Sequence, residues 1–248
     1  MGPPCITFSK YGKGEKWSNK LLRAIHDCGT CFQRKCPISI HENVPQYEEA
    51  GLVAETGLDP TLFGHPNSRE RTFRICYQKS KKKWACDMTL QQIADHMLVP
   101  KKTPLPLDFH VYILKQDHEH AHEEVDLTRS ESNHLVKYRK VCPTNELFDL
   151  SANVEKRKRV ELKNRTFPCL TTSSNFWSEK FLRKLSGRER LHVLNFPCWG
   201  PGASAACVDP VDTSMVPQRV LRHMSGNVMN LSCVGFVLLM SVLFVEDR

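Results

Sequence analysis

The spacing of apolar side chains predicts a helix and two strands in the first third of the chain. Residues 17–28 carry apolar side chains at helical spacing, which predicts an amphipathic helix. Residues 36–47 form a short β-rich apolar run that is stopped at Asn43, and this predicts a buried strand with Glu42 at its C-terminal end. Residues 72–77 alternate with β character and predict a further strand. Strands and a helix in this part of the chain favour α/β architecture.

Two later segments are typical of helices. Residues 178–194 carry apolar side chains at helical spacing, and a loop rich in Gly, Pro and Ala at 197–210 follows them. The segment 231–245 has fifteen residues without a charge, fewer than the ~20 residues that span a bilayer. We therefore predict a buried helix there and no membrane partner, with a membrane tail anchor as the alternative.

The stretch between the predicted strands and these helices has no strong periodicity. Lysines cluster at 79–83, prolines interrupt residues 100–106, and basic side chains return at 156–159. We interpret this stretch as a small irregular lobe. The predicted domains are 1–78, a first part of the core; 79–170, a variable lobe; and 171–248, a C-terminal part of the core.

The composition is that of an intracellular globular protein with a basic surface. Hydrophobic residues make up 40% of the 248 positions, which excludes full disorder. The 11 cysteines are odd in number and irregularly spaced, and the N-terminal residues lack the basic and apolar regions of a secretory signal. The formal charge of +8 favours a polyanionic partner without identifying one.

Cys5 directly follows Pro3 and Pro4. Because proline fixes φ and cannot continue a regular element, the cysteine is expected in a stiff loop. A thiolate held in this way suits nucleophilic attack, provided that nearby dipoles or cations lower the pKa of its thiol. Taken alone, the pattern favours a buried structural cysteine over a nucleophile.

Five short segments in a fixed order change that interpretation. They are Gly-Pro-Pro-Cys-Ile-Thr-Phe-Ser at 2–9, His-Glu-Asn-Val at 41–44, Phe-Gly-His-Pro-Asn-Ser-Arg-Glu-Arg at 63–71, Arg-Lys-Leu-Ser-Gly-Arg-Glu-Arg with Leu-Asn-Phe-Pro at 183–197, and Gly-Asn-Val at 226–228. In this order they resemble the nucleophile loop, the Glu-Asn-Val, Gly-x-Pro-Gln-x-Arg-x-Arg and Arg-x-Leu-Thr-x-Arg-Glu…Gly-Phe-Pro segments and the final Gly-Asn-Ser of cytosine-C5 DNA methyltransferases. The resemblance extends over nearly the whole chain. It implies an α/β fold with an incomplete doubly wound, Rossmann-like methyltransferase sheet, and a target-recognition role for the lobe at 79–170.

The resemblance also implies a role for each catalytic residue. Cys5 is the expected nucleophile that adds to C6 of cytosine, and Glu42 is the expected contact to N3, with Asn43 positioning that loop. Arg69 and Arg71 are expected to bind the base carbonyl, to anchor the nucleophile loop or to hold phosphate. The implied partner is duplex DNA with the target cytosine flipped out of the stack. The implied location is the nucleus, or the cytoplasm of a bacterial-type cell.

The implied cofactor is S-adenosylmethionine, which Gly226 and Asn227 are expected to approach. The chain departs from the family at Ile6, Asn67 and Val228, where glutamine, glutamine and serine are usual. It also begins at the nucleophile loop, so the glycine-rich loop that lies upstream in the family is not in this sequence. We therefore keep two hypotheses. The first is a methyltransferase whose missing N-terminal half another chain could supply, and the second is a truncated, inactive fragment that binds or scaffolds nucleic acid.

One further pattern offers a metal site. His26, Cys28, Cys31, Cys36 and His41 have a spacing that could hold zinc. The family interpretation already uses this stretch as a helix that leads into a buried strand. We therefore predict no metal site.

Overall fold

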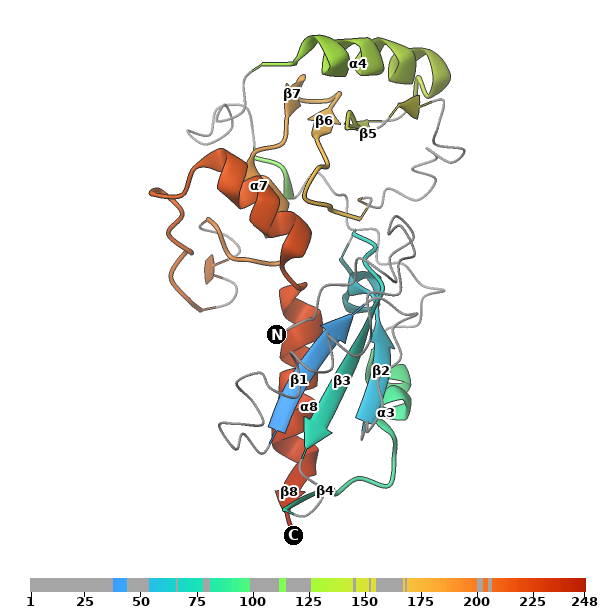
Figure 1. The fold of residues 1–248 in the computed structure, drawn as a ribbon, viewed down its shortest axis with the longest axis vertical. Helices are drawn as coiled ribbons and strands as arrows, with labels where there is room; N and C mark the ends of the chain where they lie inside the picture. Colours follow the sequence, from blue (N-terminus) through green and yellow to red (C-terminus); the bar gives the residue numbers. More distant parts are fainter. Residues whose placement is uncertain are drawn as a thin grey trace, which may run out of the picture. The chain divides into compact units, whose positions relative to one another are not determined.

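The computed structural model describes residues 38–43, 54–65, 67–77, 81–98, 112–114, 126–144, 146–151, 153–154, 167, 169–199, 203–204 and 207–248. The chain divides into two compact units, whose elements are shown in Figure 1. Unit 1 comprises Met1–Phe63, Glu70–Thr103 and Ser232–Arg248, and unit 2 comprises Gly64–Arg69 and Pro104–Leu231.

Unit 1 is built on a three-stranded antiparallel sheet in the order β1-β3-β2. Its elements are β1 (Ile38–Asn43), β2 (Ala54–Leu58), the 3-10 helix η1 (Pro60–Phe63), β3 (Arg71–Tyr77), β4 (Lys82–Trp84), α3 (Leu90–Met97), α8 (Leu231–Phe244) and β8 (Val245–Asp247). Because β1 and β2 both run antiparallel to β3, the C-terminal ends of β1 and β2 lie beside the N-terminal end of β3. The predicted strands at 36–47 and 72–77 are confirmed, whereas the helix predicted at 17–28 lies outside the described residues.

Helix α8 confirms the helix predicted at 231–245, although only one of its sides is buried. Its buried side includes Cys233, Phe236, Val237 and Met240, which recur at helical spacing. Within unit 1, the ring of Phe236 meets Phe63 edge to face with their centroids 6.0 Å apart. The helix is therefore anchored by one stripe of apolar side chains.

The opposite side of α8 carries exposed apolar side chains. Leu238 and Leu239 are each 50% exposed, and Val242 is 80% exposed. No single helix of the described residues has the length and composition of a membrane span. The helix α7 (Gln218–Asn227) and α8 have the length and composition of a membrane span only when the two are counted together as a broken pair.

Unit 2 contains a second small antiparallel sheet, in the order β5-β6-β7. Its elements are α4 (Arg129–Val141), β5 (Leu147–Asp149), β6 (Phe176–Ser178), β7 (Arg183–Lys184), α5 (Gly187–Val193) and α7. Tyr138 of α4 stacks on Phe148 of β5 with their ring centroids 5.3 Å apart, and Trp177 of β6 joins the same buried cluster. Phe176 points to a second cluster with Phe167, so the two sides of β6 are both buried.

The helix predicted at 178–194 is wrong in its first half. Residues 176–178 and 183–184 form the strands β6 and β7, and Leu182 in the turn between them adopts a positive φ of 50° that no helix interior accepts. The helix α5 starts at Gly187, because the side chain of Ser186 accepts a hydrogen bond from the backbone of Glu189 and the side chain of Glu189 accepts one from the backbone of Ser186.

The lobe predicted as irregular also contains regular elements. The helices α3 and α4 both lie within residues 79–170, and each begins with a capping box. The compact units have other boundaries than the predicted domains, since residues 79–103 belong to unit 1 and residues 171–231 belong to unit 2. The assignment of a target-recognition role to residues 79–170 stays a prediction.

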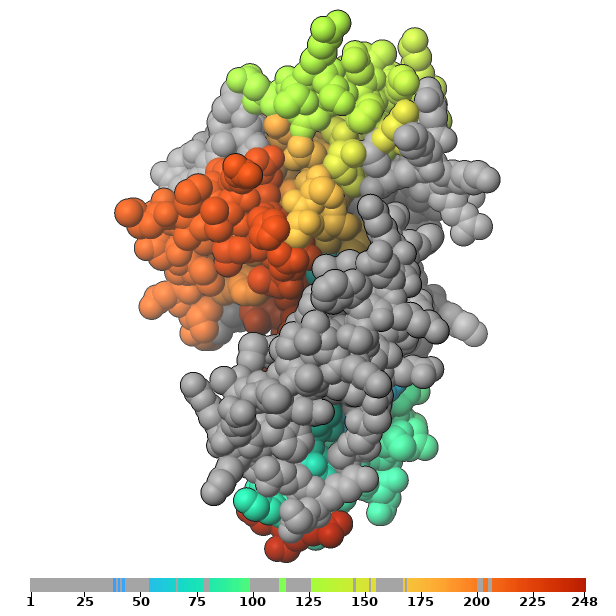
Figure 2. Space-filling model, viewed as in Figure 1, coloured from blue at the N-terminus to red at the C-terminus, as the bar shows by residue number. Residues whose placement is uncertain are grey.

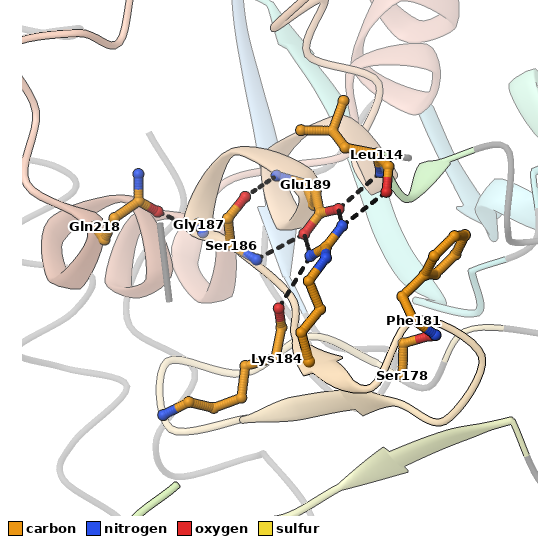
Figure 3. Close-up of polar contacts among 9 residues, drawn as sticks. Leu114, Ser178, Phe181, Lys184, Ser186, Gly187, Glu189 and Gln218 are labelled. Atoms are coloured by element: carbon orange, nitrogen blue, oxygen red, sulfur yellow. Dashed lines mark hydrogen bonds and ion pairs between the residues drawn. The ribbon is translucent and has the colours of Figure 1, made fainter. Parts of the chain in front are cut away.

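A buried ion pair joins β7 to α5 in unit 2 (Figure 3). Arg183 donates from Nη1 and Nη2 to the two carboxylate oxygens of Glu189, at 2.9 and 2.7 Å. The same guanidinium donates to the carbonyl of Leu114 at 2.7 Å, while the amides of Leu114 and Ser186 each donate to Glu189 at 2.7 Å. Glu189 is fully buried, so its carboxylate depends on these donors in place of water.

We expect Glu189→Gln to destabilise unit 2 by about 3–5 kcal/mol, because it leaves the charge of Arg183 buried without a carboxylate. The measurement is urea unfolding, followed by circular dichroism. The matched control is Arg139→Gln, which breaks the more exposed ion pair of Arg139 with Glu179 and should cost ~1 kcal/mol or less. Equal losses in the two variants would contradict the assignment.

Candidate functional site

Glu42 and Arg71 meet at the end of the unit 1 sheet where β1 ends and β3 begins. Glu42 lies opposite Phe73, and Arg71 precedes Phe73 by two residues, so both side chains are on one face. Nε of Arg71 is 3.0 Å from Oε1 of Glu42, and the two side chains are 18% and 13% exposed. The structure thus brings two of the predicted site residues together.

The carboxylate of Glu42 keeps capacity for a further contact. Its Oε1 has no hydrogen bond of good geometry among the described residues, so the contact with Arg71 is an ion pair rather than an aligned hydrogen bond. The guanidinium of Arg71 is also fixed from the other side, since its Nη1 donates to the carbonyl of Glu70 at 2.7 Å.

Two more polar groups belong to the same part of unit 1. Asp59 directly follows β2 and accepts hydrogen bonds from the amide and the hydroxyl of Thr61, at 2.9 and 2.6 Å. Cys233 is buried in the first turn of α8. Burial raises the pKa of its thiol, and the negative charges of Asp59 and Glu42 raise it further. Cys233 therefore stays protonated and does not serve as a nucleophile.

Cys5, the predicted nucleophile, lies outside the described residues. Asn43 is the last residue of β1, where its backbone is in register with Thr72, but its side chain is outside the description. The cysteines and histidines of the possible zinc pattern are likewise outside it, apart from the backbone of His41. Among the residues that the structure does describe, no group of three or more His, Cys, Asp or Glu could hold a metal.

Arg69 has a structural role in unit 2. Its side chain is buried, and its guanidinium donates to the carbonyl of Leu170 at 2.6 Å and to the carbonyl of Gly226 at 3.0 Å. These bonds join the loop before β6 to the C-terminal end of α7. Arg69 and Arg71 belong to different units, so sequence proximity does not give them one role.

Gly226 lies where α7 approaches the loop at Thr171 and Thr172 closely. A Cβ at this position would lie 2.1 Å from the amide nitrogen of Thr172 and 2.4 Å from the carbonyl carbon of Thr171. Backbone atoms therefore fill the space on that side of Gly226. Asn227, the last residue of α7, is exposed.

His65 is a half-buried imidazole inside unit 2. Its Nδ1 is 2.9 Å from the hydroxyl of Tyr112, and its Nε2 is 2.6 Å from Nδ2 of Asn195. Burial lowers the pKa of His65 to about 4, so the ring is neutral near pH 7. Asn195 has φ of 68°, a conformation that asparagine tolerates. It stands where the resembled Gly-Phe-Pro segment has glycine, so the change is structurally compatible.

Sequence reasoning missed a second group of polar residues, in unit 2. Arg219, Arg222 and His223 are three and four residues apart on α7, and they line one pocket with the Ser/Thr-rich loop at 172–175. The helical spacing of these basic residues was visible in the sequence. What the sequence did not show is that this face of α7 lies beside the loop.

Comparisons with known proteins give a fold and no family. No family model matches the chain, and no curated protein matches it. Among solved structures it resembles the Dnmt2 methyltransferase of S. pombe, with 14% identity, a TM-score of 0.54 and coverage of 98% of this chain and 77% of that one. It also resembles a triple mutant of DNMT2 from Spodoptera frugiperda, with 16% identity, a TM-score of 0.53 and coverage of 97% and 77%. The chain therefore has an α/β fold like that of these methyltransferases.

We expect Gly226→Ala to destabilise unit 2, because the added methyl group would overlap backbone atoms that cannot rotate away. The matched control is Gly235→Ala in α8, where a Cβ meets nothing within 4 Å and helix propensity should raise stability by about 0.5–1 kcal/mol. Thermal and urea unfolding of both variants measure the effect. A stabilising Gly226→Ala would show that the close approach is absent.

We expect acid to weaken unit 2 through His65. The unfolded chain binds the imidazole proton near pH 6.5 and the folded chain only near pH 4, so this stability is fully present above pH 6.5 and falls as the pH drops toward 4. The loss should reach about 3 kcal/mol at most. Urea unfolding from pH 7 to pH 4 measures it. His65→Gln should flatten this part of the pH dependence, whereas His96→Gln, at an exposed position of α3, should leave it unchanged.

Proposed function

We propose that this chain acts as a cytosine-C5 methyltransferase on a nucleic acid, with DNA as the substrate that its sequence motifs favour. The observation that carries the proposal is the Glu42–Arg71 pair at the C-terminal end of β1. The carboxyl ends of strands are where open α/β sheets place their ligands. The likeness of the fold to Dnmt2 structures over nearly the whole chain supports the same function.

The chemistry begins with addition to the base. C5 of cytosine is a poor nucleophile until a group adds to C6, and we assign this role to the thiolate of Cys5. The Sγ–C6 bond forms as the electron pair of the C5–C6 double bond moves to C5 and into the ring. Glu42 shares a carboxyl proton with N3 and so offsets the negative charge that develops there, while Arg71 stabilises the carboxylate that remains. Once C5 has used this electron pair to bond a methyl group or a solvent proton, loss of the original C5 proton and departure of the thiolate restore the aromatic ring.

Arg71 is the arginine that we assign to this site. Its ion pair orients the carboxylate of Glu42, and a guanidinium also suits the carbonyl oxygen of the base. Arg69 instead donates to two carbonyls of unit 2 and acts there as an anchor. The two arginines of one sequence motif thus receive different functions.

S-adenosylmethionine is the proposed methyl donor. When bound, it would supply the methyl group that C5 takes up. The surroundings of Gly226 do not fit the predicted contact with this cofactor, because backbone atoms of Thr171 and Thr172 fill the space and the Gly226 carbonyl accepts from Arg69. Asn227, which is exposed, stays the proposed contact at this end of α7. No reaction step is assigned through Gly226.

The test is release of tritium from cytosine labelled at C5, in DNA and RNA oligonucleotides, without a methyl donor. Addition of a thiolate at C6 allows a solvent proton to add at C5 and the tritium to leave, so release reports the first step alone. We expect Cys5→Ser to abolish release and Glu42→Gln to lower its rate by about 100-fold or more.

The matched control is Glu55→Gln. Glu55 pairs with Arg74 on the same sheet, at 2.9 Å, but it is 47% exposed and has no proposed role. Release should therefore be unchanged in this variant. Release that survives Cys5→Ser, or that falls equally in Glu42→Gln and Glu55→Gln, would overturn the proposed function.

A further inference from the structure

Unit 2 contains a pocket that the chemistry above does not use. Its volume is about 630 Å³, and its lining comes from the loop before β6 and from α7. Figure 2 shows these two segments side by side on the surface, the loop in gold and α7 in orange-red. The lining contains three arginines and a histidine, and among the described residues that form it there is no carboxylate.

The floor of the pocket is a buried cation. Arg190 of α5 is 1% exposed, and its Nη1 and Nη2 donate to the carbonyls of Ser174 and Thr171 at 2.6 and 2.8 Å. These bonds hold the loop in place. The guanidinium of Arg190 thereby lies at the pocket and contributes a positive charge to its lining.

The α7 side of the pocket adds positive charge at a fixed position. Arg222 donates from Nη1 to the side-chain carbonyl of Asn175 at 3.2 Å, so its guanidinium is held beside the loop. Arg219 precedes it by three residues and is exposed, as is His223. Both can therefore reach a ligand from solvent.

The loop side offers hydroxyl groups. Thr172 and Ser173 are exposed at the turn, and Ser174 is fixed by contacts with the amide of Thr171, at 3.0 Å, and with its hydroxyl, at 2.8 Å. Hydroxyls beside guanidinium groups, without a carboxylate, are the donor set that binds phosphate oxygens.

We propose that this pocket binds a backbone phosphate of the nucleic-acid strand that carries the target cytosine. The inference rests on the proposed function for the identity of the strand. The volume exceeds what one phosphate group needs and lies in the range of ligand pockets, so the sugars on either side of a phosphodiester can also enter. The net charge of +8 favours the same polyanion.

The experiment is fluorescence anisotropy with a labelled cytosine-containing oligonucleotide, at several salt concentrations. The double variant Arg219→Ala with Arg222→Ala should bind about 10-fold or more weakly at 0.1 M salt, and the slope of log affinity against log salt should fall by about 1 to 2. The control is Arg129→Ala with Lys140→Ala, which removes two exposed charges from α4 in the same unit and should change affinity by less than about 3-fold.

Several outcomes would overturn the phosphate inference. One is an equal loss in the double variant and its control, which would reduce the effect to net charge. Another is a loss of inorganic phosphate binding in the double variant while its affinity for the oligonucleotide is unchanged, which would identify a pocket for free phosphate. Unchanged melting of the double variant without ligand excludes misfolding as the cause of a loss.

The two proposals fail separately. If the oligonucleotide binds in an Arg219-dependent and Arg222-dependent manner but no tritium leaves C5, the proposed function is wrong and the phosphate site stands. If tritium leaves at the normal rate with an unchanged KM in the double variant, the phosphate site is wrong and the proposed function stands.

Discussion

The buried ion pair of Arg183 with Glu189 is the interaction on which the arrangement of unit 2 depends. A carboxylate without access to water is stable only when several donors surround it, and here a guanidinium and two backbone amides do so. Each donor comes from a different place: β7, the segment at Leu114 and the start of α5. Their common acceptor therefore fixes the point where the strand ends and the helix begins. Because Arg190 is on the same short helix, this constraint also fixes the floor of the basic pocket.

Three elements of unit 1, β1, β3 and α8, could be predicted from the sequence because their signals are local, whereas β2, β4, α3 and β8 were not predicted. A β-rich run that ends at Asn43 and an alternating run before Tyr77 specify β1 and β3, and the register of the two strands then places Glu42 near Arg71. Length and apolar character specify α8 in the same way. The pairing of those strands was not predictable from either run alone, since strand order depends on the whole sheet.

Unit 2 was harder to predict because the decisive contacts join residues far apart in the chain. Apolar spacing at 178–194 suits a helix, yet tertiary contacts turn its first half into a hairpin, and the capping pattern of Ser186 with Glu189 was the local sign of the true start. Arg69 and Gly226 were assigned to the site from motif order. The carbonyls that Arg69 binds belong to Leu170 and Gly226, which are 101 and 157 residues away from it along the chain. No local pattern in the sequence could therefore show that Arg69 joins these two backbone segments.

The close approach at Gly226 limits how this sequence can change over time. Helix and loop are in contact there through main-chain atoms, and an amino-acid substitution in the loop cannot remove main-chain atoms to make room. Any side chain at position 226 therefore requires a simultaneous change in the path or length of the loop at 171–172. In related chains, the identity of this residue and the length of that loop should vary together or not at all, which makes the pair a marker for correct alignment of this part of the fold.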